Sequence, residues 1–90
     1  MNKVELINRI VEETGLTWKD ASTAIDGMVK VITTAVSRGE KVSVTGFGMF
    51  HRRFREGGTR RIPKTGEIVE VQAKYVPSFR PGKELKDAVK

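Results

Sequence analysis

The stretch from residue 17 to residue 38 constrains the fold most, because it holds more apolar side chains than one small chain can cover. Its apolar positions recur at spacings of three and four, which predicts an amphipathic helix. They are Ala21, Ala24, Ile25, Met28, Val29, Val31, Ile32, Ala35 and Val36. One short helix and a small sheet would struggle to cover so wide a stripe. Its width therefore predicts burial against a second copy of the chain.

The size of the chain supports the same expectation. Ninety residues make one domain, and a monomer of this size buries only about 60% of the surface that its unfolded chain exposes. The sequence has no cysteine and one histidine, His51, which excludes disulfides, thiolate metal sites and histidine-rich metal clusters. Of the usual ways to stabilise a small fold, oligomerisation remains.

Capping residues mark the ends of the first two helices. Residues 2–14 are predicted to form a helix that begins at the N-cap Asn2 and ends at Gly15, which suits the left-handed position after a helix. The second helix covers residues 17–38 and has Thr17 as its N-cap. These two helices make up most of the first half of the chain.

The second half reads as strands followed by a short helix. Residues 41–45 and 67–73 alternate polar and apolar side chains, which is typical of half-buried strands. Residues 49–55 are interpreted as a further strand that leads into the basic segment. Residues 83–89 predict a terminal helix with Leu85, Ala88 and Val89 facing inward. The expected order is ααβββα, an α+β fold with no internal repeat.

The positive charge is confined to the second half. Residues 1–50 carry six Lys/Arg and six Asp/Glu, whereas residues 51–90 carry eleven and five, so the whole net charge of +6 lies there. Five arginines fall within ten positions, and a turn-like tip at residues 62–66 follows them. Arginine suits phosphate because its planar fork presents several donors. This pattern predicts a basic hairpin arm, residues 52–75, that binds a polyanion.

The residues favour nucleic acid over an anionic membrane or a heparin-like polymer. A membrane-surface protein would carry its cations on an amphipathic helix, whereas these arginines lie in strand-like sequence. The N-terminus has no continuous apolar region typical of a signal peptide, and no apolar run approaches the roughly 20 residues that span a bilayer. An intracellular protein is expected.

Enzymatic motifs find little support. The glycines of Gly46-Phe47-Gly48 lie between strands, and position 51 has histidine where a dinucleotide loop would have its third glycine. Gly82-Lys83 is followed by Glu84 where a P-loop requires serine or threonine. His51 has no evident carboxylate partner. We therefore expect neither catalysis nor a cofactor nor a metal.

The second half contains the run GFGMF at residues 46–50, the pattern R-x-P-x-T-G at residues 61–66 and the pattern VPxFxxGKxLKDAV at residues 76–89. These motifs resemble those of the HU/IHF family of bacterial DNA-bending proteins. The opening MNKxELI is similar to the start of HU chains. The resemblance extends over all 90 residues and favours the HU type.

The resemblance implies an intertwined dimer of ααβββα chains. Each chain would form one DNA-bending domain, with a helical dimerisation part at residues 1–40, a three-stranded antiparallel sheet with its arm at residues 41–82, and a C-terminal helix at residues 83–90. The residues expected in the dimer core are Ile25, Met28, Val29, Ile32, Val36, Phe47, Phe50 and Phe79. An identical partner is expected, with a related chain as the alternative.

The resemblance also implies that the two arms of the dimer embrace DNA through the minor groove. Pro63 matches the proline that intercalates between base pairs at the arm tip in this family, and Ile62 would enlarge this wedge. The residues expected to bind DNA are Arg52, Arg53, Arg55, Arg60, Arg61, Ile62, Pro63, Lys64, Lys74, Arg80, Lys83, Lys86 and Lys3. The arm departs from the family pattern where Gly58 replaces an arginine, Arg60 a glycine and Ile62 an asparagine.

The expected function is that of a nucleoid-associated architectural protein that bends or wraps double-stranded DNA. Asn and Gln are sparse near the arm and no recognition helix is evident, so low sequence specificity is expected, with a preference for bent, nicked or junction DNA. The alternative is a sequence-specific factor of the IHF type, or a virus-encoded relative. The expected location is the cytoplasm, on the bacterial nucleoid, or on viral DNA for a viral protein.

Overall fold

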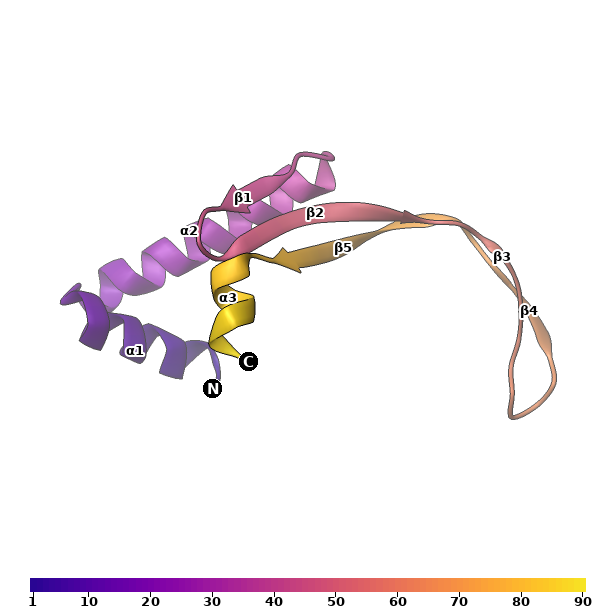
Figure 1. The fold of residues 1–90 in the computed structure, drawn as a ribbon, viewed down its shortest axis with the longest axis horizontal. Helices are drawn as coiled ribbons and strands as arrows, with labels where there is room; N and C mark the ends of the chain where they lie inside the picture. Colours follow the sequence, from indigo (N-terminus) through magenta and orange to yellow (C-terminus); the bar gives the residue numbers. More distant parts are fainter. The chain divides into compact units, whose positions relative to one another are not determined.

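The computed structural model describes residues 1–90, which divide into two compact units, Met1–Thr34 and Ala35–Lys90. Helices come first, five short strands follow, and a helix ends the chain (Figure 1). The elements are α1 (Lys3–Thr14), α2 (Trp18–Ser37), β1 (Val42–Val44), β2 (Gly48–Arg55), β3 (Gly58–Arg61), β4 (Ile68–Val71), β5 (Lys74–Pro81) and α3 (Lys83–Ala88).

The caps predicted for the first two helices are confirmed. The Asn2 side chain accepts a hydrogen bond of 2.9 Å from the Glu5 amide, and the Thr17 hydroxyl accepts one of 3.1 Å from the Asp20 amide. Gly15 has a left-handed backbone, and its amide donates to the Val11 carbonyl. Each bond satisfies a polar group that a helix end would otherwise leave without a partner.

The core of the first unit is small. Ile7 on α1 packs with Ala21 and Ile25 on α2, and these three are the buried apolar residues of the chain. Ile10 and Val11 cover part of the same cluster. Of the residues predicted for a dimer core, Ile25 is thus already buried within one chain.

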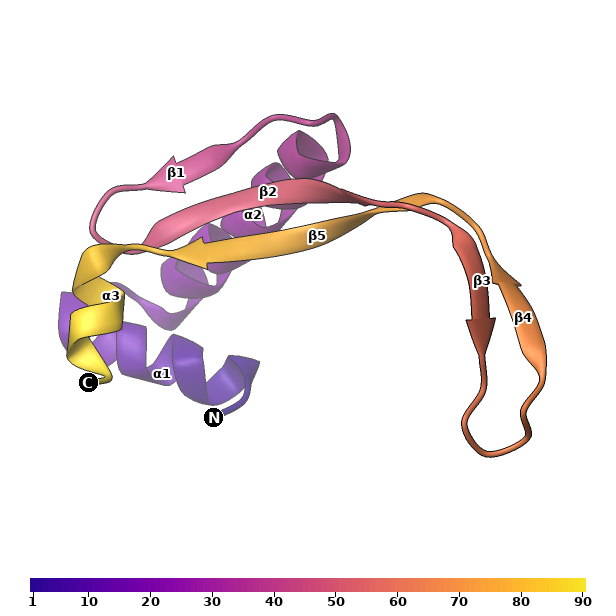
Figure 2. The same cartoon turned by 45° about the vertical axis from the view of Figure 1, so that its right-hand side comes forward.

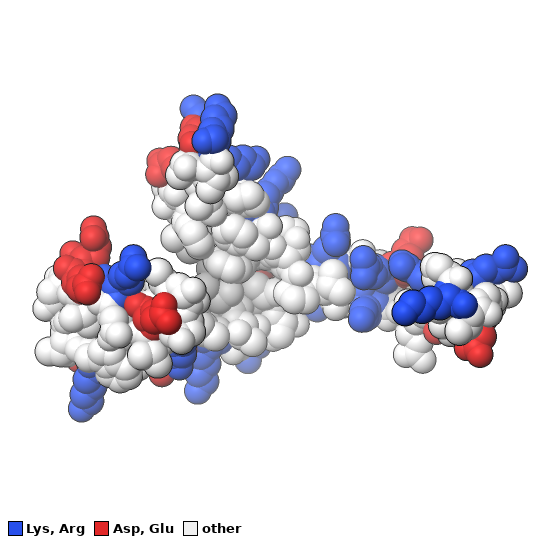
Figure 3. Space-filling model, turned by 90° about the horizontal axis from the view of Figure 1, so that it is seen from below, with Lys and Arg blue, Asp and Glu red and all other residues white.

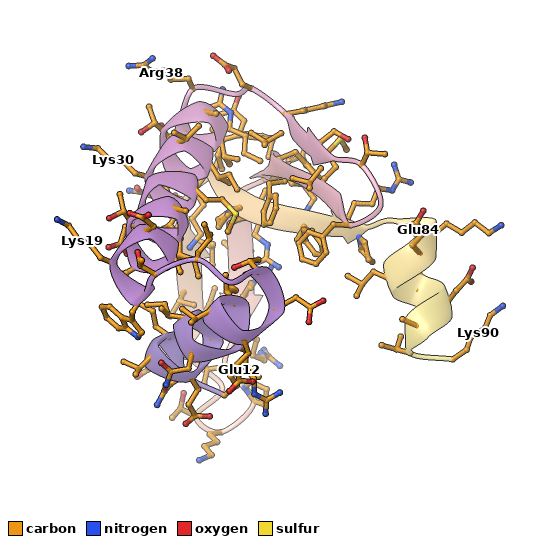
Figure 4. The ribbon with its side chains drawn as sticks, turned by 90° about the vertical axis from the view of Figure 1, so that its left-hand side faces the viewer. Glu12, Lys19, Lys30, Arg38, Glu84 and Lys90 are labelled. Atoms are coloured by element: carbon orange, nitrogen blue, oxygen red, sulfur yellow. The ribbon has the colours of Figure 1, made fainter.

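Most of the wide apolar stripe on α2 remains uncovered. Met28 is 53% exposed and Val29 is 55% exposed, while Ile32 and Val36 are half-buried. The charged side chains Lys19 and Lys30 project from a common side of α2 (Figure 4). A single chain therefore leaves apolar surface on this helix that water would have to solvate at a cost of roughly 25 cal/mol per Å².

The predicted three-stranded antiparallel sheet is confirmed, with β2 between β1 and β5. Phe50 pairs with Val42 on β1 and with Phe79 on β5. The Phe50 and Phe79 rings lie 4.7 Å apart between centroids, and Phe47 lies 5.2 Å from Phe79. This phenylalanine cluster is only partly covered, because Phe47 is 44% exposed and Phe79 is 36% exposed.

The arm is a hairpin, but each of its two strands is interrupted once. β2 and β5 lie side by side, and the ribbon continues through β3 and β4 to its tip after a change of direction (Figures 1 and 2). The breaks fall at Glu56-Gly57 and at Gln72-Ala73. A Cβ on Gly57 would lie 2.5 Å from the Val71 carbonyl oxygen, so the two backbones approach too closely there for any other residue. The two long strands of the expected hairpin are thus each divided in two, which gives five strands where the sequence indicated three.

Alanine at Gly57 will disturb this junction, whereas alanine at Gly58 will not. The Cβ at position 57 must displace backbone atoms, at a cost of about 1–3 kcal/mol, whereas a Cβ at position 58 meets nothing within 4 Å. We expect Gly57→Ala to lose amide hydrogen-exchange protection in β3 and β4, and Gly58→Ala to keep it. Equal protection in both variants would contradict the close approach.

The C-terminal helix is shorter and less covered than the sequence predicts. α3 ends at Ala88, and Val89 is 78% exposed. Leu85 is half-buried, and Ala88 is exposed. The inward orientation expected for Ala88 and Val89 is therefore wrong for the single chain, in which no apolar surface covers the end of this helix.

Candidate nucleic-acid interface

Strand alternation separates the arginines of β2 onto two faces of the sheet. In the register between β2 and β5, Arg53 is opposite Val76 and Arg55 is opposite Lys74, while Phe54 is opposite Tyr75. Because successive side chains point to opposite faces of a strand, Arg53 and Arg55 share one face. Arg52 and Phe54 lie on the other.

The first of these faces gathers cations from both strands. Lys74 and Arg80 on β5 are paired with Arg55 and Met49 on β2, so they lie on the same face as Arg53. We call the four residues Arg53, Arg55, Lys74 and Arg80 the basic face. A shallow concavity on it has Lys41, Arg53 and Arg80 among the residues that line it. His51 lines the same concavity, beside the arginines and without a carboxylate.

The cations of the arm have no acidic partner. The two ion pairs of the structure are Lys3–Asp26 and Lys90–Asp87, and neither involves a residue of the arm. Lys and Arg side chains are concentrated along the arm, with a few acidic groups among them (Figure 3). Uncompensated guanidinium groups on an exposed ribbon are suited to bind phosphates.

Arg52 differs from the other arginines because partners within the chain engage it. Its Cζ atom lies 3.8 Å from the centroid of the Tyr75 ring, and its Nη1 donates a hydrogen bond of 3.3 Å to the Ser37 carbonyl at the end of α2. The Phe54 ring meets Tyr75 edge-on, with centroids 5.3 Å apart. We call Arg52, Phe54 and Tyr75 the root stack.

The outer part of the arm presents its two arginines to opposite sides. Arg60 is opposite Val69 and Arg61 is opposite Ile68 in the register of β3 and β4. Because they are neighbours on one strand, their side chains point to opposite faces. Both are exposed, so the ribbon can contact phosphates on either side of its plane.

Hydrogen bonds across its base hold the tip as a tight loop. The Ile62 amide donates to the Glu67 carbonyl at 2.8 Å, and the Gly66 amide donates to the Ile62 carbonyl at 2.7 Å. Pro63 and Lys64 lie within this loop and are exposed, whereas Ile62 is half-buried. The structure thus presents an apolar ring with a constrained backbone at the most distant part of the ribbon.

The remaining predicted DNA-binding lysines lie on helices. Lys83 and Lys86 are exposed on α3, which directly follows β5. Lys3 on α1 is paired with Asp26, with 2.6 Å between Nζ and Oδ1, so its charge is compensated within the first unit. No group of acidic, histidine or cysteine side chains could hold a metal ion, and no helix is both long and apolar enough to cross a membrane.

Reasoning from the sequence missed the root stack and the division of the arginines between faces. The division could have been predicted, because side chains alternate between the two faces of a strand and this puts Arg52 on the same face as Phe50 and Phe54. Nothing local signals the contact with Tyr75, which lies 23 positions from Arg52 along the chain.

Comparison with known proteins gives consistent matches over the full length. The family model described as "Bacterial DNA-binding protein" matches residues 1–90. The DNA-binding protein HU of Geobacillus stearothermophilus is 51% identical over 90 residues, covering all of both chains. The DNA-binding protein HU 1 of Bacillus subtilis is 47% identical over 89 residues, covering 99% of this chain and 97% of the relative.

Solved structures of similar proteins share the fold. The HU of an Anabaena HU–DNA cocrystal structure matches with a TM-score of 0.91 and 39% identity, covering 99% of this chain and 97% of that one. The HU from Thermotoga maritima matches with a TM-score of 0.70 and 38% identity over all of both chains.

Proposed function

The chain belongs to the HU/IHF family of bacterial DNA-binding proteins, and we propose that it is a nucleoid-associated architectural protein that binds and bends double-stranded DNA. The observation that carries this proposal is the basic face together with the exposed arm arginines, none of which has an acidic partner. The role needs no cofactor and no catalytic group, because binding and deformation are its whole chemistry.

We propose that the working form is a homodimer. The supporting observation is apolar surface that one chain leaves uncovered, on α2 at Met28 and Val29 and in the phenylalanine cluster at Phe47 and Phe79. Three buried apolar residues are too small a core for a stable chain of this length. A second copy would cover both surfaces, with residues 1–40 as its main dimerisation part; a heterodimer with a related chain is the alternative.

The arms of such a dimer would hold DNA through the minor groove. Arginines on both faces of the ribbon would neutralise phosphates and enter the groove where it is narrow and its negative potential is strongest. Pro63, with Ile62 beside it, would insert between base pairs and unstack them. Unstacking costs a few kcal/mol per step, and this cost is offset because bent DNA reaches more of the protein surface.

Flanking DNA would then meet the basic face and α3. Arg53, Arg55, Lys74 and Arg80 lie on one side of the sheet, and Lys83 and Lys86 are exposed on the helix that follows it. These cations would hold phosphates beyond the kink. Lys3 could join them only by leaving Asp26.

The proposed binding has low sequence specificity. Phosphate contacts position a protein without reading bases, and between residues 52 and 75 the arm offers many cations but one amide side chain, Gln72. DNA that is already bent, nicked or branched should bind best, because part of the deformation is then already present. Footprinting on genomic DNA separates this function from that of an IHF-like or virus-encoded site-specific factor: diffuse protection supports it, and discrete sites favour the alternative.

The salt dependence of binding tests the phosphate contacts. Arg61→Ala should make the slope of log K against log salt shallower by about 0.9 for each phosphate that Arg61 neutralises, measured by fluorescence anisotropy on a labelled duplex. Lys30→Ala is the matched control, because Lys30 projects from α2 in the first unit (Figure 4) and should leave the slope unchanged. An unchanged slope for Arg61→Ala would show that this residue does not bind phosphate.

A further inference from the structure

We propose that Arg52 is a positioning residue that ties the root of the arm to the end of α2 and thereby sets the direction in which the arm meets DNA. The inference rests on the proposed function, but it assigns this arginine a role other than phosphate binding. It follows from two contacts of one guanidinium group and from the glycine beside it, all within the unit Ala35–Lys90.

The first contact is with the aromatic pair of the root stack. The Arg52 Cζ lies 3.8 Å from the centroid of Tyr75, and Tyr75 is in turn held edge-on by Phe54. The guanidinium is planar and weakly hydrated, so it can stack on a ring and still donate hydrogen bonds. Lysine cannot do both, because its ammonium is a compact and strongly hydrated charge.

The second contact is with the C-terminal end of α2. The Arg52 Nη1 donates to the Ser37 carbonyl at 3.3 Å, and the last turn of α2 contains no basic residue of its own. The carbonyl end of a helix carries partial negative charge that a nearby cation stabilises. Arg52 therefore places a cation from β2 at this end of α2, in addition to Arg38, which directly follows Ser37.

The turn after α2 leaves space for this side chain at Gly39. A Cβ on Gly39 would lie 3.0 Å from the Arg52 Nη2, so glycine leaves room for the guanidinium against the backbone. Gly39 also has a φ of 85°, a conformation that glycine adopts readily and most other residues adopt rarely. The guanidinium thus links β2 to β5 on one side and to the turn after α2 on the other.

The contacts of Arg52 can affect DNA binding because they lie at the root of the arm. Arg52 lies at the root of the arm, on the face opposite the basic face, where it is half-buried. A small change of angle at the root displaces the distant tip by much more. If only a fraction of molecules hold the arm in the competent direction, the apparent affinity falls by that fraction.

Three variants test the inference. Arg52→Gln removes the cation from the Tyr75 ring, and Arg52→Lys leaves a cation that cannot hold the ring and the Ser37 carbonyl together. Arg53→Gln is the matched control because its side chain is next along the strand but lies on the basic face. A cation–π contact at an exposed site corresponds to roughly 2- to 5-fold in an equilibrium constant. We expect both Arg52 variants to lose about this much affinity for an intact duplex and to bend it less in an energy-transfer assay, with the salt slope unchanged. Arg53→Gln should instead reduce the slope by about 0.9 for each phosphate that Arg53 neutralises.

Variants of Tyr75 supply the second arm of the test. Tyr75→Phe keeps the ring and should behave as the unaltered protein, whereas Tyr75→Leu should reproduce the Arg52→Gln phenotype, with no further loss in the double variant. In the free protein, the NMR signals of the Arg52 side chain should show an upfield ring-current shift that Tyr75→Leu abolishes.

The possible results distinguish a failure of the Arg52 inference from a failure of the proposed DNA-binding function. A salt slope that falls in Arg52→Gln as much as in Arg53→Gln would overturn the inference in favour of a phosphate contact. DNA bending and DNA affinity of Arg52→Gln equal to those of the unaltered protein would also overturn the inference. Absence of salt-dependent DNA binding by the unaltered protein would overturn the proposed function, while the ring-current shift would still show whether the root stack exists.

Discussion

Replacing Phe79 by alanine should destabilise the folded protein by about 3–5 kcal/mol per protomer, the range for truncating a buried phenylalanine. Within one chain the Phe79 ring contacts Phe50 and Phe47 at centroid distances of 4.7 and 5.2 Å, yet it remains 36% exposed. The full loss is expected only if a second copy of the chain covers the cluster. Urea unfolding followed by circular dichroism at several protein concentrations measures this loss.

Phe54→Ala is the matched control for this experiment. Phe54 is also an aromatic residue paired with another ring, but it lies in the arm and is 54% exposed. We expect its loss to cost about 1 kcal/mol, the value of an aromatic pair with little burial. A dimer also predicts an unfolding midpoint that rises with protein concentration. Equal costs for the two variants, with a midpoint independent of concentration, would contradict the dimer.

Pro63→Ala should lower affinity for an intact duplex by about tenfold while leaving affinity for a nicked duplex nearly unchanged. The tip hydrogen bonds join Ile62 to Gly66 and Glu67, so they do not depend on residue 63 and the loop should persist. What the variant loses is the rigid apolar ring that would enter between base pairs. A deficit of about 1.4 kcal/mol in the unstacking step corresponds to the tenfold change, and a nick supplies the kink in advance.

Energy transfer across labelled duplexes gives the bend, and anisotropy gives the affinity. Lys64→Ala is the control, because Lys64 is the exposed neighbour of Pro63 in the same loop. Removing its charge should weaken binding to intact and nicked DNA alike and reduce the salt slope. If Pro63→Ala lowered the affinity for intact and for nicked DNA by the same factor, Pro63 would be a surface contact and not a wedge.

The sequence predicted a basic arm as the candidate site, but it did not predict how the arginines of the arm are arranged. Five arginines in ten positions and a proline at the tip predict a basic arm, and the structure places all of them on a ribbon. The sequence treats the five as one group. Alternation along β2 separates Arg52 from Arg53 and Arg55, and the register with β5 brings Tyr75 to Arg52. The group is thus divided into phosphate-binding candidates and one residue that is engaged within the chain.

The sequence by itself determined the local structure and the sign of the partner's charge. Asn2 and Thr17 specify where α1 and α2 begin, because capping acts within one helical turn. The net charge follows from the composition and does not depend on the fold. Only the tertiary structure decided which cations of β5 share a face with those of β2, where the arm changes direction, and what Arg52 contacts. These features depend on strand register and on the close approach of backbones at Gly57, which join residues far apart along the chain and leave no pattern in either segment alone.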